Sequence, residues 1–307
     1  MARMDSVPTS TGSALETYCD RLLGFTIPGR DARGRLVRLE NPLDEILAAH
    51  EYPAPITHML AEALVLTTLL GGLVKGENSQ LTMQAQTENG PVRLLVCDYR
   101  DGELRGYADF DKEAVEGLGA SPSLAALFGK GYLAITFDLP GEKGRYQGIV
   151  PLEGESLAQA CEAYFAQSEQ VPTLISVAVS SRESGCHAAG LLVQHLPDGE
   201  EGRERLHARL DHPEWEHVAI LAGTIRHSEL LGSDLSLEAL VWRLFHEEDQ
   251  VNVQSGVRIS RGCRCSPEHY EQVLAQFSQE ELAEMRSESG EIPVDCAFCS
   301  KVFRIVL

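Results

Sequence analysis

The stretch Leu81-Thr82-Met83-Gln84-Ala85-Gln86, followed closely by Glu88-Asn89-Gly90-Pro91, decides the fold class of this chain. Apolar and polar residues alternate in its first part, which is the period of a half-buried β-strand. The second part is typical of a turn. Residues 92–99 then have the pattern of another strand, so the sequence predicts an antiparallel hairpin here.

Similar strand patterns surround this hairpin in the N-terminal two thirds of the chain. Helical periodicity covers residues 55–70, where Gly71-Gly72 weakens or ends it, and Ser156 begins a capping box that opens another helix. Because the strands cluster in hairpins, we predict an α+β domain in residues 1–196, an antiparallel sheet with helices on one side. Its further strands are expected at 103–107, 132–139, 145–150, 173–180 and 186–194.

The composition changes to polar and charged from Pro197 onward. Helices are expected over residues 212–222 and after the cap residue Ser236. The second of these helices has a narrow apolar stripe with helical spacing, formed by Leu237, Leu240, Val241, Leu244 and Phe245. Residues 197–250 are therefore predicted to be a helical linker whose stripe packs on a neighbouring domain.

The chain is strongly acidic, because 26 Lys and Arg residues against 46 Asp and Glu residues give a net charge of −20. Such a surface repels nucleic acid and anionic membranes, so neither is expected as a partner. No secretory signal is visible at the N-terminus. The apolar stretch 59–74 is interrupted by Glu62 and is expected to be too short and too polar to span a bilayer. We therefore expect a cytoplasmic location.

Four of the eight cysteines lie close to the C-terminus, in Gly-Cys-Arg-Cys and Cys-Ala-Phe-Cys. Four thiolates in two closely spaced pairs match the tetrahedral coordination of Zn²⁺. The predicted ligands of one Zn²⁺ ion per chain are Cys263, Cys265, Cys296 and Cys299. Residues 251–307 would form a small zinc-binding module, with helices after Ser266 and Ser278 and a terminal strand at 302–306.

A module of this size depends on its metal. Structural zinc contributes about 10–16 kcal/mol in small modules, whereas a whole domain is stable by only about 5–15 kcal/mol. Each cysteine pair can also close on itself, Cys263 with Cys265 and Cys296 with Cys299. The first of these disulfides closes a tight ring and should be readily reduced again. Oxidation would therefore release the metal and unfold the module.

Other functions fit these cysteines less well. A plain structural zinc knuckle without redox chemistry remains open. A thioredoxin-like enzyme is disfavoured because no βαβ unit surrounds the motif, and a nucleic-acid-binding finger is disfavoured by the acidity. Neither a phosphate loop nor a catalytic triad is visible, so no enzymatic activity is expected. The remaining cysteines are expected to be buried apolar residues: Cys19, Cys97, Cys161 and Cys186.

The chain resembles the 33 kDa chaperonin family, the redox-regulated heat-shock holdases. The resemblance rests on the cysteine motif together with Arg-Tyr-Gln-Gly-Ile-Val at 145–150, Tyr-Phe-Ala-Gln-Ser-Glu-Gln at 164–170 and Trp-Arg-Leu-Phe-His-Glu-Glu at 242–248. It implies an ATP-independent chaperone that is inactive while the four cysteines hold zinc. Under oxidative stress the thiols pair, zinc leaves, the metastable linker loses order, and the protein dimerises and holds unfolding client proteins.

The apolar stripe of the linker suggests where clients bind. If the zinc module melts, the stripe loses its partner and is exposed beside a charged, solubilising frame. We hypothesise that the stripe and the sheet face that it uncovers bind clients. The alternative is an interaction adaptor whose zinc knuckle docks a fixed partner without redox switching.

Overall fold

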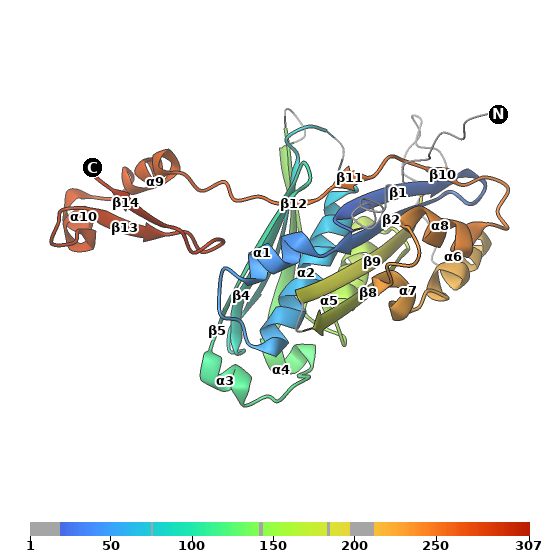
Figure 1. Ribbon diagram of the computed structural model, residues 1–307, viewed down its shortest axis with the longest axis horizontal. Coiled ribbons are helices and arrows are strands. Elements are labelled where there is room, and N and C mark those ends of the chain that lie inside the picture. The colour runs from blue at the N-terminus through green and yellow to red at the C-terminus, as the bar shows by residue number, and fades with distance from the viewer. Residues whose placement is uncertain (1–18, 75, 141–143, 183–184, 197–211) are drawn as a thin grey trace, which may run out of the picture.

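The computed structural model describes residues 19–74, 76–140, 144–182, 185–196 and 212–307. Residues 1–18, where no secretory signal is expected, and the charged start of the linker at 197–211 lie outside these ranges. In the described part, the N-terminal body contains two six-stranded sheets with a long helix between them, and helices also cover the far face of the first sheet (Figure 1). The predicted α+β class is confirmed.

The first sheet has the strand order β10-β1-β2-β9-β8, and β11 also pairs with β1. Every pairing in it is antiparallel. The first two strands, which are joined by a short 3₁₀ turn (Pro28–Arg30), were not predicted from the sequence. The strands of this sheet are β1 (Arg21–Ile27), β2 (Ala32–Leu39), β8 (Thr173–Arg182), β9 (Gly185–His195), β10 (Asn252–Val253) and β11 (Val257–Arg258).

The second sheet has the order β12-β5-β4-β3-β6-β7. Leu81, Met83 and Ala85 are buried in it, as their alternation predicts, while the residues between them lie on the other face. The strand β12 pairs with β5 in parallel, and the other neighbours are antiparallel. The strands are β3 (Gln80–Thr87), β4 (Val92–Arg100), β5 (Glu103–Phe110), β6 (Gly131–Leu139), β7 (Gly144–Pro151) and β12 (Ser260–Arg261).

The helix α2 (Ala54–Gly71) contacts strands of both sheets and is buried on nearly all sides. The prediction of one sheet with helices on one side was therefore wrong, because periodicity cannot show that a helix is covered twice. The helix is also long and apolar enough, by length and composition, to cross a membrane, which corrects the expectation for residues 59–74. Its most apolar 18-residue window is 72% buried inside the protein, and this packing accounts for its composition.

Shorter helices pack against the two sheets and α2. The predicted capping residue Ser156 accepts a hydrogen bond from the N–H of Gln159, which confirms the start of α5. This helix continues as a π-helical segment (Phe165–Glu169). The helices around the sheets are α1 (Asn41–Leu47), α3 (Lys112–Glu116), α4 (Leu124–Phe128) and α5 (Leu157–Tyr164).

The far face of the first sheet is covered by α6 (Pro213–Gly223), α7 (His227–Leu231) and α8 (Leu237–Phe245). All five residues of the predicted stripe on α8 are buried in one cluster with apolar residues of β1, β2 and β9. The guanidinium of Arg38 on β2 donates hydrogen bonds to the carbonyls of Glu229, Leu230 and Leu235. The stripe therefore packs on the N-terminal body, as expected.

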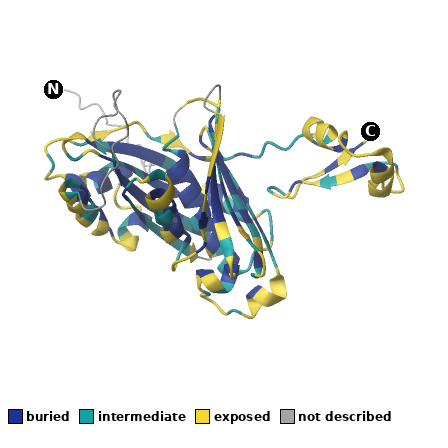
Figure 2. Cartoon of the chain, turned by 180° about the vertical axis from the view of Figure 1, so that it is seen from behind, coloured by how far each residue is buried: buried dark blue, intermediate teal, exposed yellow. Residues whose placement is uncertain are grey.

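A strap, residues 252–262, leads from this helical layer along both sheets to the C-terminal module (Figure 1). The module contains α9 (Pro267–Leu274), α10 (Gln279–Met285), β13 (Ile292–Asp295) and β14 (Val302–Ile305), with a small apolar cluster of its own. Its helices and outer surface are largely exposed (Figure 2). Because the strap pairs with the N-terminal sheets, the division of the chain after residue 250 stays a prediction.

We predict that Leu240→Ala lowers the free energy of unfolding by about 2–5 kcal/mol, because the side chain of Leu240 on α8 is fully buried against the first sheet. Trp242→Ala on the same helix is the matched control. Trp242 is 68% exposed, so its loss should change stability by less than about 0.5 kcal/mol. Urea titration followed by circular dichroism measures both values. Equal effects of the two substitutions would contradict the packing of α8 described above.

Candidate metal and redox centre

The four predicted cysteines come together at the end of the strap. The Sγ atom of Cys263 lies 3.3 Å from that of Cys265 and 3.6 Å from that of Cys296. The Sγ atoms of Cys265 and Cys299 are 3.5 Å apart. All four sulfurs lie within 4.8 Å of one another. A tetrahedral Zn²⁺ site with Zn–S bonds of about 2.3 Å needs sulfurs about 3.8 Å apart, so the spacing fits a metal ion.

Two short turns present these sulfurs. The first knuckle, residues 262–265, directly follows β12 and ends at Ser266, whose hydroxyl accepts the N–H of His269 and begins α9. The second knuckle, residues 296–301, connects β13 to β14. In this knuckle the N–H groups of Cys299 and Ser300 both donate to the carbonyl of Cys296, and Ser300 has a positive φ of 55°. The turn therefore curls the backbone around the sulfurs of Cys296 and Cys299.

The surroundings of the sulfurs favour ionisation of one thiol. Burial opposes the charged form of Cys296, but hydrogen bonds from the Tyr270 hydroxyl and from the N–H groups of Cys299 and Phe298 outweigh it and lower its pKa to about 6. Burial raises the pKa of Cys265. The thiolate is the form of cysteine that acts as a nucleophile and that binds metal ions. Because its pKa is lowered, Cys296 can take either role at neutral pH.

The arginine between the first two cysteines contacts the N-terminal body. The guanidinium of Arg264 donates to Asp98 on β4 over 3.3 Å. The carboxylate of Asp98 is buried and also accepts hydrogen bonds from Arg105 and Thr82. The Nη1 atom of Arg264 is buried and has no acceptor among the described residues. One nitrogen of the Arg264 guanidinium is therefore left without a hydrogen bond in the described part of the chain. The bond to Asp98 nevertheless fastens the first knuckle to the second sheet.

The second knuckle is fastened to the same region. The carbonyl of Ala297 lies 2.7 Å from Nε2 of His50, and the hydroxyl of Ser300 donates to the carbonyl of Ala49 over 2.6 Å. The guanidinium of Arg105 lies 4.0 Å from the centre of the Phe298 ring. The residues that contact the N-terminal body thus lie between or beside the metal-site cysteines. The positions of the sulfurs and the docking of the module are consequently coupled.

These docking residues were not found by sequence reasoning. Asp98 and Arg105 lie on strands far from the cysteines along the chain, and His50 lies in a loop after α1. The types and spacing of these three residues do not form a recognisable sequence motif. Only the pairing of β12 with β5 brings the first knuckle beside them.

The other cysteines take no part in the cluster. Cys97, Cys161 and Cys186 are buried, as expected, whereas Cys19 is half-buried. Burial raises the pKa of all four thiols, that of Cys19 to about 12 with a contribution from Glu40. These side chains stay protonated at neutral pH and are poor ligands and nucleophiles.

The fold and the site define a class of protein: a two-sheet α+β body carrying a C-terminal module with a four-thiol centre for metal or redox chemistry. The family model described as Hsp33 protein matches residues 20–306. The chain belongs to the Hsp33 family. This membership supports a chaperone function.

Individual relatives cover nearly the whole chain. It is 38% identical over 294 residues to the 33 kDa chaperonin of Caulobacter vibrioides (strain NA1000 / CB15N), covering 93% of this chain and 94% of the relative. It is 38% identical to that of Shewanella woodyi, covering 92% and 91%. The solved 33 kDa chaperonin of Thermotoga maritima, at 22% identity, shares the fold with a TM-score of 0.74, over 94% of this chain and 95% of that one.

We predict that Arg264→Ala loosens the docking of the module. It removes a charged hydrogen bond to a buried carboxylate, which is worth about 1–2 kcal/mol here because the guanidinium is partly exposed. The N–H of Gly262, which donates to the carbonyl of Leu104, should then exchange with solvent roughly tenfold faster. Residue-resolved hydrogen exchange measures this rate.

Lys301→Ala is the control, because it removes the same charge beside the second cysteine pair. Lys301 is exposed, and its ammonium lies 5.0 Å from the centre of the Phe303 ring within the module. The exchange rate of Gly262 should be unchanged by this substitution. If both variants behave alike, the contact with Asp98 does not hold the first knuckle.

Proposed function

We propose that this chain is a redox-regulated, ATP-independent holdase that binds unfolding proteins under oxidative stress in the cytoplasm. The observation that carries the proposal is the four-sulfur cluster, whose cysteines flank the residues Arg264 and Ala297 that contact the N-terminal body. Membership in the Hsp33 family supports the chaperone activity. Curated relatives that are named 33 kDa chaperonin support it as well.

In the reduced state the proposed metal ligands are Cys263, Cys265, Cys296 and Cys299. Four soft sulfur donors at tetrahedral spacing favour Zn²⁺ over magnesium or calcium. A bound Zn²⁺ ion keeps the sulfurs as thiolates and ties the two knuckles together. Cys296 also belongs to the small apolar cluster of the module. Its position therefore determines both the metal site and the packing of Phe303 and Ile305.

Oxidation would convert this arrangement into two disulfides, Cys263–Cys265 and Cys296–Cys299. Each pair of thiolates gives two electrons to one hydrogen peroxide, which takes up two protons from solvent and is reduced to two waters, and the Zn²⁺ ion is released once its four sulfur ligands are oxidised. A disulfide needs sulfurs about 2.05 Å apart, so the 3.3 Å separation of the first pair must shorten. That movement changes the backbone on both sides of Arg264. The contacts of the knuckles with Asp98, His50 and Ala49 are then lost.

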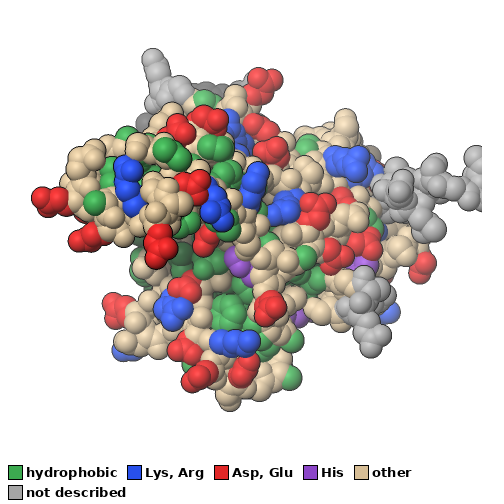
Figure 3. Space-filling view, turned by 60° about the vertical axis from the view of Figure 1, so that its left-hand side comes forward, with side chains coloured by type: hydrophobic (Ala, Val, Ile, Leu, Met, Phe, Trp, Pro, Cys, Tyr) green, Lys and Arg blue, Asp and Glu red, His purple; other side chains and the backbone are tan. Residues whose placement is uncertain are grey.

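Loss of docking would expose the client-binding surface. The helical layer formed by α6, α7 and α8 covers the first sheet through apolar contacts, and each buried large side chain there contributes about 1.5–3 kcal/mol. The proposed client-binding residues are the stripe Leu237, Leu240, Val241, Leu244 and Phe245 with the sheet face beneath it. Acidic and basic side chains interspersed on the face of the molecule seen in Figure 3 help to keep the exposed form in solution. A homodimer is expected in the oxidised state.

Treatment with hydrogen peroxide should release about one zinc ion per chain and make the protein suppress aggregation of a chemically unfolded test protein. Cys299→Ser removes one ligand and one disulfide partner, and should reduce zinc binding in the untreated protein by more than tenfold. Cys19→Ser, at a half-buried position outside the cluster, is the control. A colorimetric zinc assay and light scattering measure the two effects.

Two results would argue against this function. Equal suppression of aggregation by the reduced, zinc-loaded protein would exclude the switch. Zinc that stays bound under peroxide, without any chaperone activity, would instead favour an interaction adaptor with an inert knuckle.

A further inference from the structure

The strap, residues 252–262, covers the outer edges of both sheets. Residues 252–258 pair with β1, and residues 260–261 pair with the start of β5. In Figure 1 the strap runs along β1 and then past β12 to the module. The edge of β1 is thus a strand edge that the chain covers with its own backbone.

Main-chain hydrogen bonds hold the strap on β1. The N–H of Gln254 donates to the carbonyl of Gly24 over 2.8 Å, and the N–H of Ile259 donates to that of Asp20 over 2.8 Å. In an antiparallel strand, alternate residues point their N–H and C=O groups to opposite neighbours. Gly24 and Thr26 therefore face the strap, whereas Leu23 and Phe25 face β2.

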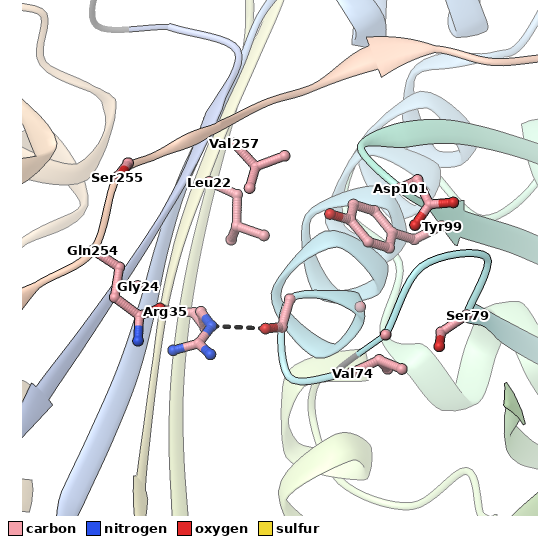
Figure 4. Close-up of a pocket in the computed structure, with 13 residues that line it drawn as sticks. Leu22, Gly24, Arg35, Val74, Ser79, Tyr99, Asp101, Gln254, Ser255 and Val257 are labelled. Carbon is pink, nitrogen blue, oxygen red and sulfur yellow. Dashed lines mark hydrogen bonds between the residues drawn. The ribbon is translucent and has the colours of Figure 1, made fainter. Parts of the chain in front are cut away.

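Side chains hold the strap only weakly. Val253 and Val257 are 44% and 45% exposed, and Ile259 is the buried apolar residue of the strap. A cavity of about 360 Å³ lies beneath it, between Gln254 and Ser255 on one side and the end of α2 on the other (Figure 4). The guanidinium of Arg35 reaches across this cavity to the carbonyl of Gly72. A segment with so few buried contacts opens at a low free energy.

The strand beneath the strap, β1, is in contrast mostly buried. Leu22 is buried in the cluster that contains α2, on one face of the sheet, and the helical layer covers three buried residues on the other face: Leu23, Phe25 and Ile27. Without the strap, β1 would be an apolar edge strand with unpaired N–H and C=O groups. Such an edge is a template for another extended chain.

The two ends of the strap are fastened differently. Upstream, Phe245 of α8 packs on Phe25, with ring centres 5.4 Å apart. Downstream, the strap continues into the first knuckle, which is held by the contact of Arg264 with Asp98. A change in the geometry of Cys263 and Cys265 therefore acts directly on the downstream end.

We propose that the outer edge of β1 is a client-binding site, which accepts an extended segment of an unfolded polypeptide as an added antiparallel strand after the strap detaches. This inference rests on the proposed holdase function and names a surface for it. The strap itself shows the geometry that a client segment would adopt. Recognition by main-chain groups needs no particular client sequence, and this suits a protein that binds many unfolded chains.

Residue-resolved hydrogen exchange on the full chain tests the site. Oxidation should speed exchange of the Thr26 amide, which pairs with Asn252 of the strap, by about tenfold or more, and adding a chemically unfolded test protein should slow it again. The amides of Leu23 and Phe25 bond to β2 and serve as internal controls that stay slow. Aggregation of the test protein is followed in the same samples by light scattering.

Each outcome has a definite meaning. If the Thr26 amide stays protected after oxidation, or if client is held while this amide remains exposed, the edge is not the site and the holdase function stands. If no client is held at all, the proposed function itself fails. If protection returns without client as the protein concentration rises, the edge binds a second copy of the chain, and the client assignment is overturned.

A substitution in the strap provides an independent test. Gln254→Pro removes the N–H that donates to Gly24, whereas Gln254→Ala keeps it. With thiols reduced and zinc bound, the proline variant should expose the Thr26 amide, which pairs with the strap, and suppress aggregation several-fold better than the alanine variant. Exposure of this amide without any gain in suppression would contradict the proposal, and so would equal suppression by both variants.

Discussion

The convergence of four sulfurs from two short turns is the constraint on which the rest of the structure depends. The turns lie at opposite ends of the module sequence, and the small apolar cluster between them includes Cys296 itself. This cluster is too small to hold the module folded without a crosslink. Because Arg264 and Ala297 contact the N-terminal body from inside the two cysteine pairs, the same sulfurs also position the module on the protein.

The N-terminal body differs from the module in how it is stabilised. The helix α2 is enclosed by two sheets, and the first sheet is enclosed in turn by α2 and the helical layer. These layers bury large continuous apolar areas, so the body does not need the metal. The strap joins the two parts with little burial of its own. Chemical change at the sulfurs is therefore expected to affect the strap and the helical layer before it affects the two-sheet core.

Much of this arrangement could be predicted from local patterns. Alternation at Leu81, Met83 and Ala85 located a strand, and the spacing of Leu240, Val241 and Leu244 located the buried face of α8, because each signal needs only a few neighbouring residues. The strands β1 and β2 were missed. In β2 the charged residues Arg33, Arg35 and Arg38 interrupt the apolar pattern and are accommodated by partners elsewhere in the fold. The enclosure of α2 by a second sheet likewise left no periodic signal.

The sequence by itself determined the α+β class, the apolar face of the linker and the four cysteines, because these are properties of residue type and short spacing. Only the tertiary structure decided where Arg264 points, which strand edges the strap covers and which residues receive the two knuckles. Those contacts join Asp98, His50 and Gly24 to positions more than 150 residues away. Contacts at such separation follow from how the sheets are ordered in space, and the order of strands in a sheet is not written in any local pattern.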